Sequence, residues 1–459
     1  MPDENWQPQI VAFVCQWCTY AGADLAGTSR MKYAPNVRIV KLPCSGRIDP
    51  LFLVKAFEQG ADGVLVSGCH PGDCHYVSGN LLARRRFTVF RELLSFLGLE
   101  RERLQFSWIS AAEAVKWTEV VDAVTEEIRQ LGPRKLSWGE TLPSRGSQFQ
   151  AASSKAEPET RNQKPKTLQA TEEGIRRIAR QLLEIAAVDV IVGYGDGTLS
   201  GVTTPLCITE PDEAERLVWN EHCLNNLSVY LTRNLVTRLG TVGIVTKGCD
   251  AKALVALLQE NRVRRDDVTI IGVECAGMME DGQLATKCIT CDVHTPPIYD
   301  HLVKVGIGNE ILEIGEPGGA DPRDTEIAAL EALTPDQRWG YWQAQFARCI
   351  RCYACRAVCP LCYCDTCIVE KTQPQWIPPA FDAKGNLSWN IVRALHLAGR
   401  CIGCDECTRA CPANIRLDLI NRKLALLIGD EYGYRAGYDA GVAPPLTTFR
   451  PEDRAEFIR

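Results

Sequence analysis

The sequence CIRCYACRAVCP at residues 349–360 recurs, with the same cysteine spacing, as CIGCDECTRACP at residues 401–412. In each copy three cysteines stand three residues apart, a fourth follows four residues later, and proline comes directly after it. Thiolates at this spacing can surround one pocket of tight loop, whose backbone N–H groups face inorganic sulfur. The closing Cys-Pro suits the start of a helix that leads away from the pocket. The repeat therefore predicts two similar iron–sulfur loops.

This spacing is that of the bacterial two-cluster ferredoxins, in which the fourth cysteine of each motif binds the cluster of the other motif. The crossed assignment gives one [4Fe–4S] cluster to Cys349, Cys352, Cys355 and Cys411, and the other to Cys401, Cys404, Cys407 and Cys359. Zinc sites instead use two separated Cys-x-x-Cys pairs, and neither the triple spacing nor the Cys-Pro ending requires zinc. Two clusters in one small domain indicate electron transfer rather than catalysis at a single site.

Three more cysteines, Cys362, Cys364 and Cys367, lie between the two copies in the stretch CPLCYCDTC. One interpretation is that they are packed or spare thiols. The other is that they complete a further cluster with ligands from a neighbouring domain. The spacing identifies no fourth ligand, so both interpretations stay open at the level of the sequence.

The composition of the chain is that of an ordinary globular protein except for its cysteines. Of 459 residues, 46% are hydrophobic and 24% charged, and the formal net charge of −6 gives no reason to expect nucleic acid as a partner. No apolar run approaches the roughly 20 residues of a transmembrane helix, and the N-terminal stretch MPDENWQPQI is too polar for a secretory signal. We therefore expect a cytoplasmic protein, in which 22 cysteines indicate metal ligation or redox chemistry.

The pattern of apolar runs predicts two α/β domains before the cysteine repeat. Strand-like runs such as QIVAFVCQ, NVRIVKLPC and GADGVLVSGC alternate with helical periodicity, which is typical of a parallel sheet. In the second domain VDVIVGYGDG, LGTVGIVTKGC and DVTIIGVEC are the expected strands, and LSVYLTRNLVTRLG and KALVALLQENRV the expected helices.

The expected parts are a parallel-sheet α/β domain (1–132), a flexible linker (133–166), a second α/β domain (167–335), a bacterial-ferredoxin-like two-cluster domain (336–428) and a C-terminal tail (429–459). The linker is rich in Ser, Gln and Pro, so we expect it to let the first domain swing. The tail is expected either to wrap a neighbour or to stay mobile.

Five cysteines of the first domain are predicted to converge: Cys15, Cys18, Cys44, Cys69 and Cys74. Three of them end predicted strands and two lie in the adjoining loops, and parallel strands share one carboxyl edge. A [2Fe–2S] cluster needs four ligands, so one cysteine is surplus, and the sequence does not choose it. His70 and His75 could suggest a site with two histidine ligands, but the surplus of cysteine makes it more reasonable to expect both histidines on the surface or beside the ligands.

The stretches CQWCTYAGADLAG, PCSGRIDP and GCHPGDCHY resemble the delta subunit of methyl-viologen-reducing hydrogenase, over about residues 8–130. The resemblance implies a [2Fe–2S] electron-transfer subunit in a multi-subunit complex. A protein of this family docks on the flavin-containing A subunit of heterodisulfide reductase and passes electrons to its bifurcating flavin from a hydrogenase, a formate dehydrogenase or an NADH-oxidising module. Arg47 and Asp49 match the family motif, and we interpret them as an ion pair that braces the loop.

The middle domain offers a glycine-rich stretch, VGYGDGTLSGVTTP, with Gly193, Gly195 and Gly197 as candidate cofactor-binding residues. It is not the dinucleotide fingerprint, so a tight turn without a ligand is an equal alternative. Two isolated cysteines, Cys207 and Cys223, are predicted to be small buried hydrophobes.

The stretches TKGCDAKAL, IGVECAGM and KCITCDVHTP resemble the beta subunit of deazaflavin-reducing hydrogenase and of some formate dehydrogenases, over about residues 167–310. The resemblance implies FAD and a third [4Fe–4S] cluster, with candidate ligands Cys249, Cys275, Cys288 and Cys291; the alternative is buried structural thiols. Lys247 could neutralise the charge of a cluster or flavin, or be solvated.

These observations support an iron–sulfur subunit that relays electrons between larger redox modules. The alternative is a flavin-containing oxidoreductase that exchanges a hydride with a deazaflavin or nicotinamide carrier. A zinc-bound scaffold is a third and remote possibility.

Overall fold

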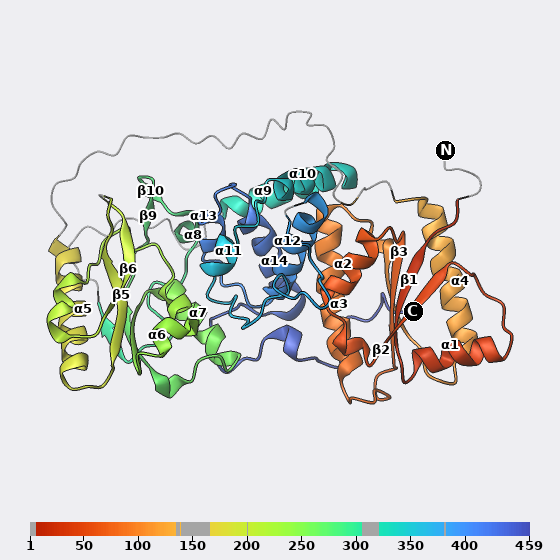
Figure 1. Ribbon diagram of the computed structural model, residues 1–459, viewed down its shortest axis with the longest axis horizontal. Helices are drawn as coiled ribbons and strands as arrows, with labels where there is room; N and C mark the ends of the chain where they lie inside the picture. Colours follow the sequence, from red (N-terminus) through yellow and green to blue (C-terminus); the bar gives the residue numbers. More distant parts are fainter. Residues whose placement is uncertain (1–5, 135–137, 139–165, 200, 305–320, 381) are drawn as a thin grey trace.

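The computed structural model describes residues 6–134, 138, 166–199, 201–304, 321–380 and 382–459. Two β-sheets lie at opposite ends of the molecule, and a group of C-terminal helices lies between them (Figure 1). The last part of the sequence is therefore the central part of the structure. Most of the expected linker, 135–137 and 139–165, lies outside the described residues.

The N-terminal domain has the predicted parallel sheet, which contains four strands in the order β2-β1-β3-β4. Its strands are β1 (Ile10–Cys15), β2 (Val37–Leu42), β3 (Gly63–Gly68) and β4 (Leu104–Trp108), and its helices are α1 (Thr19–Thr28), α2 (Pro50–Glu58), α3 (Gly79–Leu97) and α4 (Ala114–Leu131). Successive side chains of a strand point to opposite faces. Ile10, Ala12 and Val14 accordingly pack with α1 and α4, whereas Phe13 packs with α2 and α3.

The middle domain is a five-stranded mixed sheet in the order β11-β8-β7-β5-β6, in which β6 is antiparallel to β5. Its strands are β5 (Val190–Asp196), β6 (Thr203–Ile208), β7 (Val242–Thr246), β8 (Val268–Val273) and β11 (His301–Val303), beside a small hairpin of β9 (Met279–Glu280) and β10 (Gln283–Leu284). Its helices are α5 (Lys166–Glu184), α6 (Asn234–Thr237), α7 (Gly248–Gln259) and α8 (Thr286–Ile289).

The expected helix LSVYLTRNLVTRLG is wrong as a continuous element. The segment is a 3₁₀ turn at Leu227–Thr232 followed by the single turn of α6. The carboxylate of Asp250 accepts a hydrogen bond from Leu227 N at 3.0 Å, and Ser228 Oγ donates to Asp250 O at 2.7 Å. These bonds fix the segment on the first turn of α7 and outweigh the helical propensity of its sequence.

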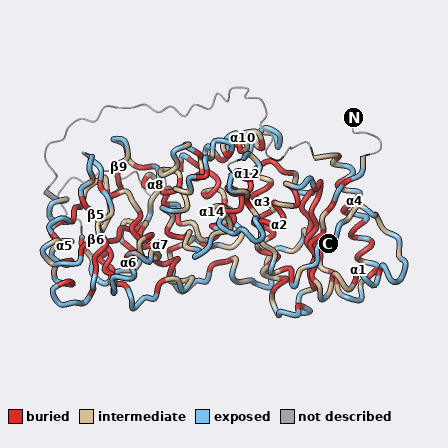
Figure 2. Tube along the Cα trace, viewed as in Figure 1, coloured by how far each residue is buried: buried red, intermediate tan, exposed pale blue. Residues whose placement is uncertain are grey.

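The central helices are α9 (Pro322–Glu331), α10 (Pro335–Ala347), α11 (Ala354–Ala357), α12 (Ala383–His396), α13 (Glu406–Arg409) and α14 (Leu417–Tyr432). α10 begins with a capping box, in which Thr334 and Gln337 satisfy each other's backbone N–H groups. None of the described helices combines the length and apolar content needed to cross a membrane. Figure 2 shows buried residues in both sheets and in these central helices.

The N-terminal domain and the central helices share one hydrophobic core. α12 packs against α2, and α10 and α14 pack against α3, around buried side chains such as Phe57, Trp342 and Trp389. Trp138, the one described residue between 134 and 166, is buried there too, with its ring 5.2 Å from that of Trp339. This packing does not leave the N-terminal domain free to swing.

The C-terminal tail wraps back onto the N-terminal domain. Arg459 N donates to Phe106 O at 3.0 Å, and Trp108 N donates to Arg459 O at 3.0 Å, so the end of the chain pairs with the edge strand β4. Upstream, Asp453 pairs with two buried arginines of α3, Arg84 and Arg85. We call this tail (429–459) the latch, because it links the central helices to the N-terminal domain of the same chain.

Candidate metal centres

Five thiols meet at the carboxyl edge of the N-terminal sheet. Cys15 ends β1, while Cys44 and Cys69 directly follow β2 and β3. With Cys74 they form a buried group, and Cys18, at the start of α1, packs against it while half-buried. The Sγ atoms of Cys15 and Cys69 are 3.6 Å apart, and those of Cys44 and Cys74 are 3.9 Å apart. The sheet edge therefore gathers the five predicted cysteines into two close pairs and a fifth thiol, Cys18, which also hydrogen-bonds Cys69.

The N-terminus of α3 closes this thiol pocket. Asn80 Nδ2 donates to Cys69 O at 2.9 Å and to His70 O at 2.8 Å, which fixes the loop after β3. A Cβ atom at Gly79 would lie 2.4 Å from Cys44 Sγ and 3.4 Å from Cys74 Sγ. Only glycine lets the helix approach so closely.

The protonation of these thiols is coupled. A hydrogen bond from Cys69 lowers the pKa of Cys15 to about 6, and the same bond, with burial, raises the pKa of Cys69. Burial raises the pKa of Cys44 to about 11. All the thiols can be thiolates together at neutral pH only if a cation compensates their charge, which is what metal binding does.

The charged and aromatic residues around the pocket have partners outside the thiol group. His70 Nε2 lies 2.7 Å from Glu113 Oε2, and the ring of His75 stacks on Trp17 at 3.8 Å. These positions suit the expectation that both histidines lie beside the ligands. Asp49 caps α2 through Leu51 N at 2.8 Å and lies 3.8 Å from His396 of α12. The expected ion pair of Arg47 with Asp49 is therefore replaced by a contact of Asp49 with the central helices.

The two cysteine motifs of the central part repeat in backbone conformation as well as in sequence. The third residue of each motif, Arg351 or Gly403, has a φ of 55° or 71°. The fifth, Tyr353 or Asp405, has a φ of 58° or 57°. Alternating left-handed residues turn successive N–H groups towards one concavity, as in many Fe–S sites. Both loops therefore have the concave shape that their spacing predicts, but no helix begins at Pro360 or Pro412, so that part of the prediction was wrong.

The thiols of the two motifs influence one another's pKa values, in part along the predicted crossed pattern. Burial raises the pKa of Cys355 to about 11, and the nearby charges of Cys349 and Cys411 add to the effect. Burial also raises the pKa of Cys407 to about 12, with further contributions from Cys401 of its own motif and Cys355 of the other.

The second crossed group is completed by Cys359. Burial and a hydrogen bond with Cys362 raise the pKa of Cys359, and Cys404 contributes as well. Cys359 thus lies close to a ligand of the other motif, as crossed ligation requires.

The three cysteines between the motifs do not form a group of their own. Cys362 shares the hydrogen bond with Cys359, Cys364 is exposed, and Cys367 packs on the core shared with the N-terminal domain. No three His, Cys, Asp or Glu side chains converge closely enough in the described parts of the chain to hold a single metal ion. The cluster assignments therefore rest on motif spacing and on pairwise contacts between thiols.

Four cysteines come together at the carboxyl edge of the middle sheet. Cys249 lies in the first turn of α7, Cys275 follows β8, and Cys288 and Cys291 flank the end of α8. Burial raises the pKa of Cys249 to about 11 and that of Cys275 to about 12. The charge of Cys249 acts on Cys275, that of Cys288 on both, and that of Cys291 on Cys288, so Cys249, Cys275 and Cys288 influence one another and Cys291 is linked through Cys288.

Two buried lysines stand beside these thiols. Lys247 Nζ donates to Asp250 Oδ2 at 2.9 Å, to Asn225 O at 2.8 Å and to Tyr194 OH. Burial opposes its charge, but Asp250 more than offsets burial, so the pKa of Lys247 is raised. Lys247 is therefore a buried cation and is not solvated. Lys287 Nζ donates to Leu224 O at 2.7 Å and lies 3.3 Å from Glu406 Oε1, next to Cys404 of the central part.

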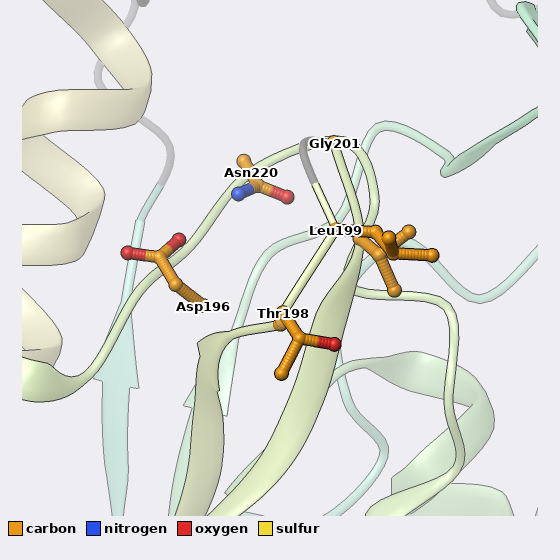
Figure 3. Close-up of a pocket in the computed structure, with 7 residues that line it drawn as sticks. Asp196, Thr198, Leu199, Gly201 and Asn220 are labelled. Atoms are coloured by element: carbon orange, nitrogen blue, oxygen red, sulfur yellow. The ribbon is translucent and has the colours of Figure 1, made fainter.

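The glycine-rich stretch is packed mainly against the protein itself. Gly193 and Gly195 lie within β5, where an added Cβ would meet Leu217 at 2.5 Å or Leu206 at 3.0 Å. Gly197 borders a cavity of about 250 Å³ lined by Asp196, Gly197, Thr198, Leu199, Gly201, Val202 and Asn220 (Figure 3). That volume is below the roughly 300–1,000 Å³ of typical ligand sites, so it does not fit a whole FAD.

The two isolated cysteines behave differently from each other. Cys223 is fully buried, as predicted. Cys207 is exposed, because it lies on the edge strand β6, so its prediction as a buried residue was wrong. Arg393 and the Lys287–Glu406 contact were not singled out from the sequence, since both depend on packing between distant segments.

Comparison with known proteins identifies the two ends of the chain. Residues 345–416 match the family described as 4Fe-4S dicluster domain, which confirms the ferredoxin-like prediction and defines an iron–sulfur protein. Residues 10–132 match the family described as methyl-viologen-reducing hydrogenase, delta subunit. Through this domain the chain belongs to the methyl-viologen-reducing hydrogenase delta-subunit family.

Individual relatives agree with this membership. Over 133 residues, 29% of this chain, the identity is 51% to an iron-sulfur subunit of the F420-non-reducing hydrogenase of Methanococcus voltae, with 92% of that relative covered. It is 52% to the corresponding protein of Archaeoglobus profundus, with 97% covered. Over 126 residues, 28% of this chain, it is 44% to the A subunit of the ferredoxin/F420H2-dependent CoB-CoM heterodisulfide reductase of Methanosarcina acetivorans, of which 16% is covered.

Proposed function

We propose that this chain is an electron relay whose cysteine sites are arranged in the order N-terminal site, first ferredoxin site, second ferredoxin site, middle site. When bound, iron–sulfur clusters accept and release single electrons. The observation that carries the proposal is that most cysteines of the two ferredoxin sites pack on different hydrophobic cores. Cys349, Cys355 and Cys411 pack on the core shared with the N-terminal domain. Of the second set, Cys359, Cys401 and Cys404 pack on the middle-domain core, whereas Cys407 lies in the core shared with the N-terminal domain.

Fixed contacts on the N-terminal side support this order. Ser388 Oγ of α12 donates to Glu58 Oε2 at the end of α2 at 2.6 Å. The ring of Phe52 on α2 lies 5.3 Å from that of Trp376 and 6.3 Å from that of Phe13 on β1. These contacts hold the thiol edge of the first sheet at a constant distance from the central loops.

Fixed contacts on the other side support it as well. Lys287 of α8 lies 3.3 Å from Glu406, which stands in the sequence between the proposed ligands Cys404 and Cys407. Arg400, the residue directly before Cys401, donates from Nη2 to Glu260 Oε2 at 2.7 Å. A relay needs such rigid spacing, because its contribution is the placement and tuning of clusters rather than bond chemistry.

The N-terminal site suits a [2Fe–2S] cluster. Two thiolates bound to one tetrahedral metal at about 2.3 Å, as in zinc sites, lie about 3.8 Å apart. The Cys15–Cys69 and Cys44–Cys74 separations of 3.6 and 3.9 Å bracket this value, so each pair would hold one iron. Cys18 is then the surplus thiol. Cys18→Ser should keep the [2Fe–2S] spectrum and Cys44→Ser should lose it; the reverse pattern would refute the assignment.

The middle site is proposed to hold a third [4Fe–4S] cluster on Cys249, Cys275, Cys288 and Cys291. Their partial burial and their influence on one another's pKa values fit thiolate ligation, and Lys247 would supply compensating charge. A flavin-containing oxidoreductase remains the second candidate through the resemblance of this domain to hydrogenase beta subunits. Acid extraction of the purified chain decides between them: released flavin, with reduction of a deazaflavin or nicotinamide carrier, would favour the oxidoreductase.

The proposed partner at the N-terminal domain is a heterodisulfide-reductase-A-like flavoprotein, with a hydrogenase, formate dehydrogenase or NADH-oxidising subunit supplying electrons. In the Methanosarcina relative a segment like this domain belongs to the reductase chain itself. Exposed Trp17, Tyr76 and Val77 surround the thiol pocket and suit such docking. Trp17→Ala in the full chain should weaken binding to the flavoprotein at least tenfold; unchanged binding would place the partner elsewhere.

The order of sites is tested by electron paramagnetic resonance on the reduced, anaerobically purified chain. A reduced cluster broadens the spectrum of its nearest paramagnetic neighbour. Cys355→Ser, which disrupts the first ferredoxin site, should remove the broadening of the [2Fe–2S] spectrum. Cys404→Ser, which disrupts the second, should leave that broadening in place. Broadening that depends on Cys404 alone would contradict the proposed order.

A further inference from the structure

Arg393 lies on α12, the central helix that packs against α2, α10 and α14. Its side chain is 3% exposed, and Nη2 donates to Cys355 O at 2.9 Å. Four thiols act electrostatically on the guanidinium: Cys355, a ligand of the first ferredoxin site, Cys359 and Cys407, ligands of the second, and Cys362, which belongs to neither proposed set. One buried cation is therefore placed against both sites.

This arginine lacks the usual compensation of a buried charge. Among the described residues no carboxylate pairs with Arg393, and its Nε has no hydrogen-bond partner. Arg323, by contrast, lies 2.6 Å from carboxylate oxygens of both Asp321 and Asp405. A buried cation without a counter-ion is costly, so the compensating negative charge must come from the thiolates and what they bind.

The electrostatics agree with this geometry. Burial disfavours the charge of Arg393, yet the surrounding thiols, led by Cys407, raise its pKa well above the ordinary value. A [4Fe–4S] cluster held by four thiolates gains one more negative charge when it is reduced. A fixed positive charge beside it therefore favours the reduced form and raises the reduction potential.

We propose that Arg393 supplies a positive charge shared by the two [4Fe–4S] sites, raising both reduction potentials together and keeping them close to each other. The inference rests on the relay proposed above. A unit charge about 10 Å away, in an effective dielectric constant of about 20, changes the ratio of reduced to oxidised cluster at fixed potential by roughly tenfold. For one electron, tenfold corresponds to 59 mV.

The test is a redox titration of the full-length, anaerobically purified chain, followed by electron paramagnetic resonance. Arg393→Met should lower the reduced-to-oxidised ratio of both [4Fe–4S] clusters at least about tenfold, with iron content unchanged. Arg393→Lys keeps the charge and should stay within about threefold of the wild type. Arg422→Met is the matched control, because Arg422 is paired with Asp324 at 2.8 Å and should leave both clusters unaffected.

The outcomes separate this inference from the relay itself. Wild-type chain without [4Fe–4S] clusters would refute the relay. Intact clusters whose ratios change less than twofold in Arg393→Met would refute the role of Arg393 alone, and so would a change confined to one cluster. If Arg393→Met loses iron, Arg393→Gln is measured in its place. A reduced-to-oxidised ratio that falls as far in Arg393→Lys as in Arg393→Gln would overturn the proposal. Loss of iron in all three variants, with Arg422→Met intact, would make Arg393 a structural residue and also overturn it.

Discussion

The latch between the C-terminal tail and α3 predicts how firmly the N-terminal domain is held. Asp453 is the acceptor at its centre: Arg85 donates to its carboxylate at 2.6 and 2.8 Å, and Arg84 at 3.3 Å. The side chains of both arginines are 3% exposed and that of Asp453 is 8% exposed. Replacing Asp453 by alanine leaves two buried guanidinium groups without their carboxylate.

The size of the effect follows from this burial. Removing one partner of a buried ion pair costs about 3–5 kcal/mol, because the remaining charge is uncompensated. Each 1.4 kcal/mol is a factor of ten, so the open form of the latch should become about 10²- to 10³-fold more populated, or more. Arg454 offers a matched control on the same tail, since its pair with Glu431 is 65% exposed on the arginine side and is worth at most about 1 kcal/mol.

Hydrogen exchange measures this opening directly. The amides of Trp108 and Arg459 are bonded across the latch, so their exchange reports the open population. Exchange in the peptides containing these amides should accelerate at least about 100-fold in Asp453→Ala and less than about fivefold in Arg454→Ala. An Asp453→Ala variant with protection within threefold of the wild type would refute the reasoning.

The same latch should respond to acid. Burial opposes ionisation of Asp453, but Arg85 and the backbone N–H of Arg450 outweigh it and lower the pKa of the carboxyl. A depressed carboxyl pKa gives stability that is present above the unfolded pKa of about 3.9 and is lost as the pH falls through the folded pKa. Tail protection in the wild type should therefore decline below about pH 4, and Asp453→Ala should lack this step.

Three further substitutions test the separate sites. Gly79→Ala should abolish the [2Fe–2S] spectrum and spare the other clusters, because the new Cβ would lie 2.4 Å from Cys44 Sγ. The control Gly27→Ala places its Cβ with nothing within 4 Å and should leave the spectra of all clusters unchanged. Lys247→Met should lower the free energy of unfolding by about 3–5 kcal/mol in denaturant titration, because it leaves a buried carboxylate unpaired, and a loss below 1 kcal/mol would contradict this. Cys207→Ser should alter stability by less than about 0.5 kcal/mol and leave iron content unchanged, whereas loss of iron would reveal a ligand.

Local patterns predicted the elements whose structure is decided locally. The apolar run GVLVSG became the fully buried strand β3, and the apolar run IVAFVC became β1, which lies between two helical layers. The cysteine spacing predicted the ferredoxin loops, because ligand geometry restricts the sequence strongly. The grouping of the five N-terminal cysteines was predictable for a different reason: Cys15, Cys44 and Cys69 end or follow strands that share one edge, and Cys18 and Cys74 lie in the adjoining loops.

Features that depend on contacts between distant segments could not be predicted. The antiparallel strand β6 contains Pro205 and is mostly not buried, so it lacks the apolar run of a central strand. The placement of the ferredoxin part between the two sheets depends on the packing of α12 against α2 and on the latch of the tail. Arg393 is a single arginine in an ordinary helical pattern, SWNIVRALH, and only the fold brings thiols from two loops to it.

The most direct test of the relay is the metal and sulfide content of the full-length chain, purified without oxygen, together with electron paramagnetic resonance during stepwise reduction. The relay predicts about ten iron atoms per chain from one [2Fe–2S] and two [4Fe–4S] clusters, and about fourteen if the middle site is filled. It also predicts paramagnetic centres that interact in the order of the sites. Stoichiometric zinc, or disulfides in place of iron at the repeated motifs, would contradict the account.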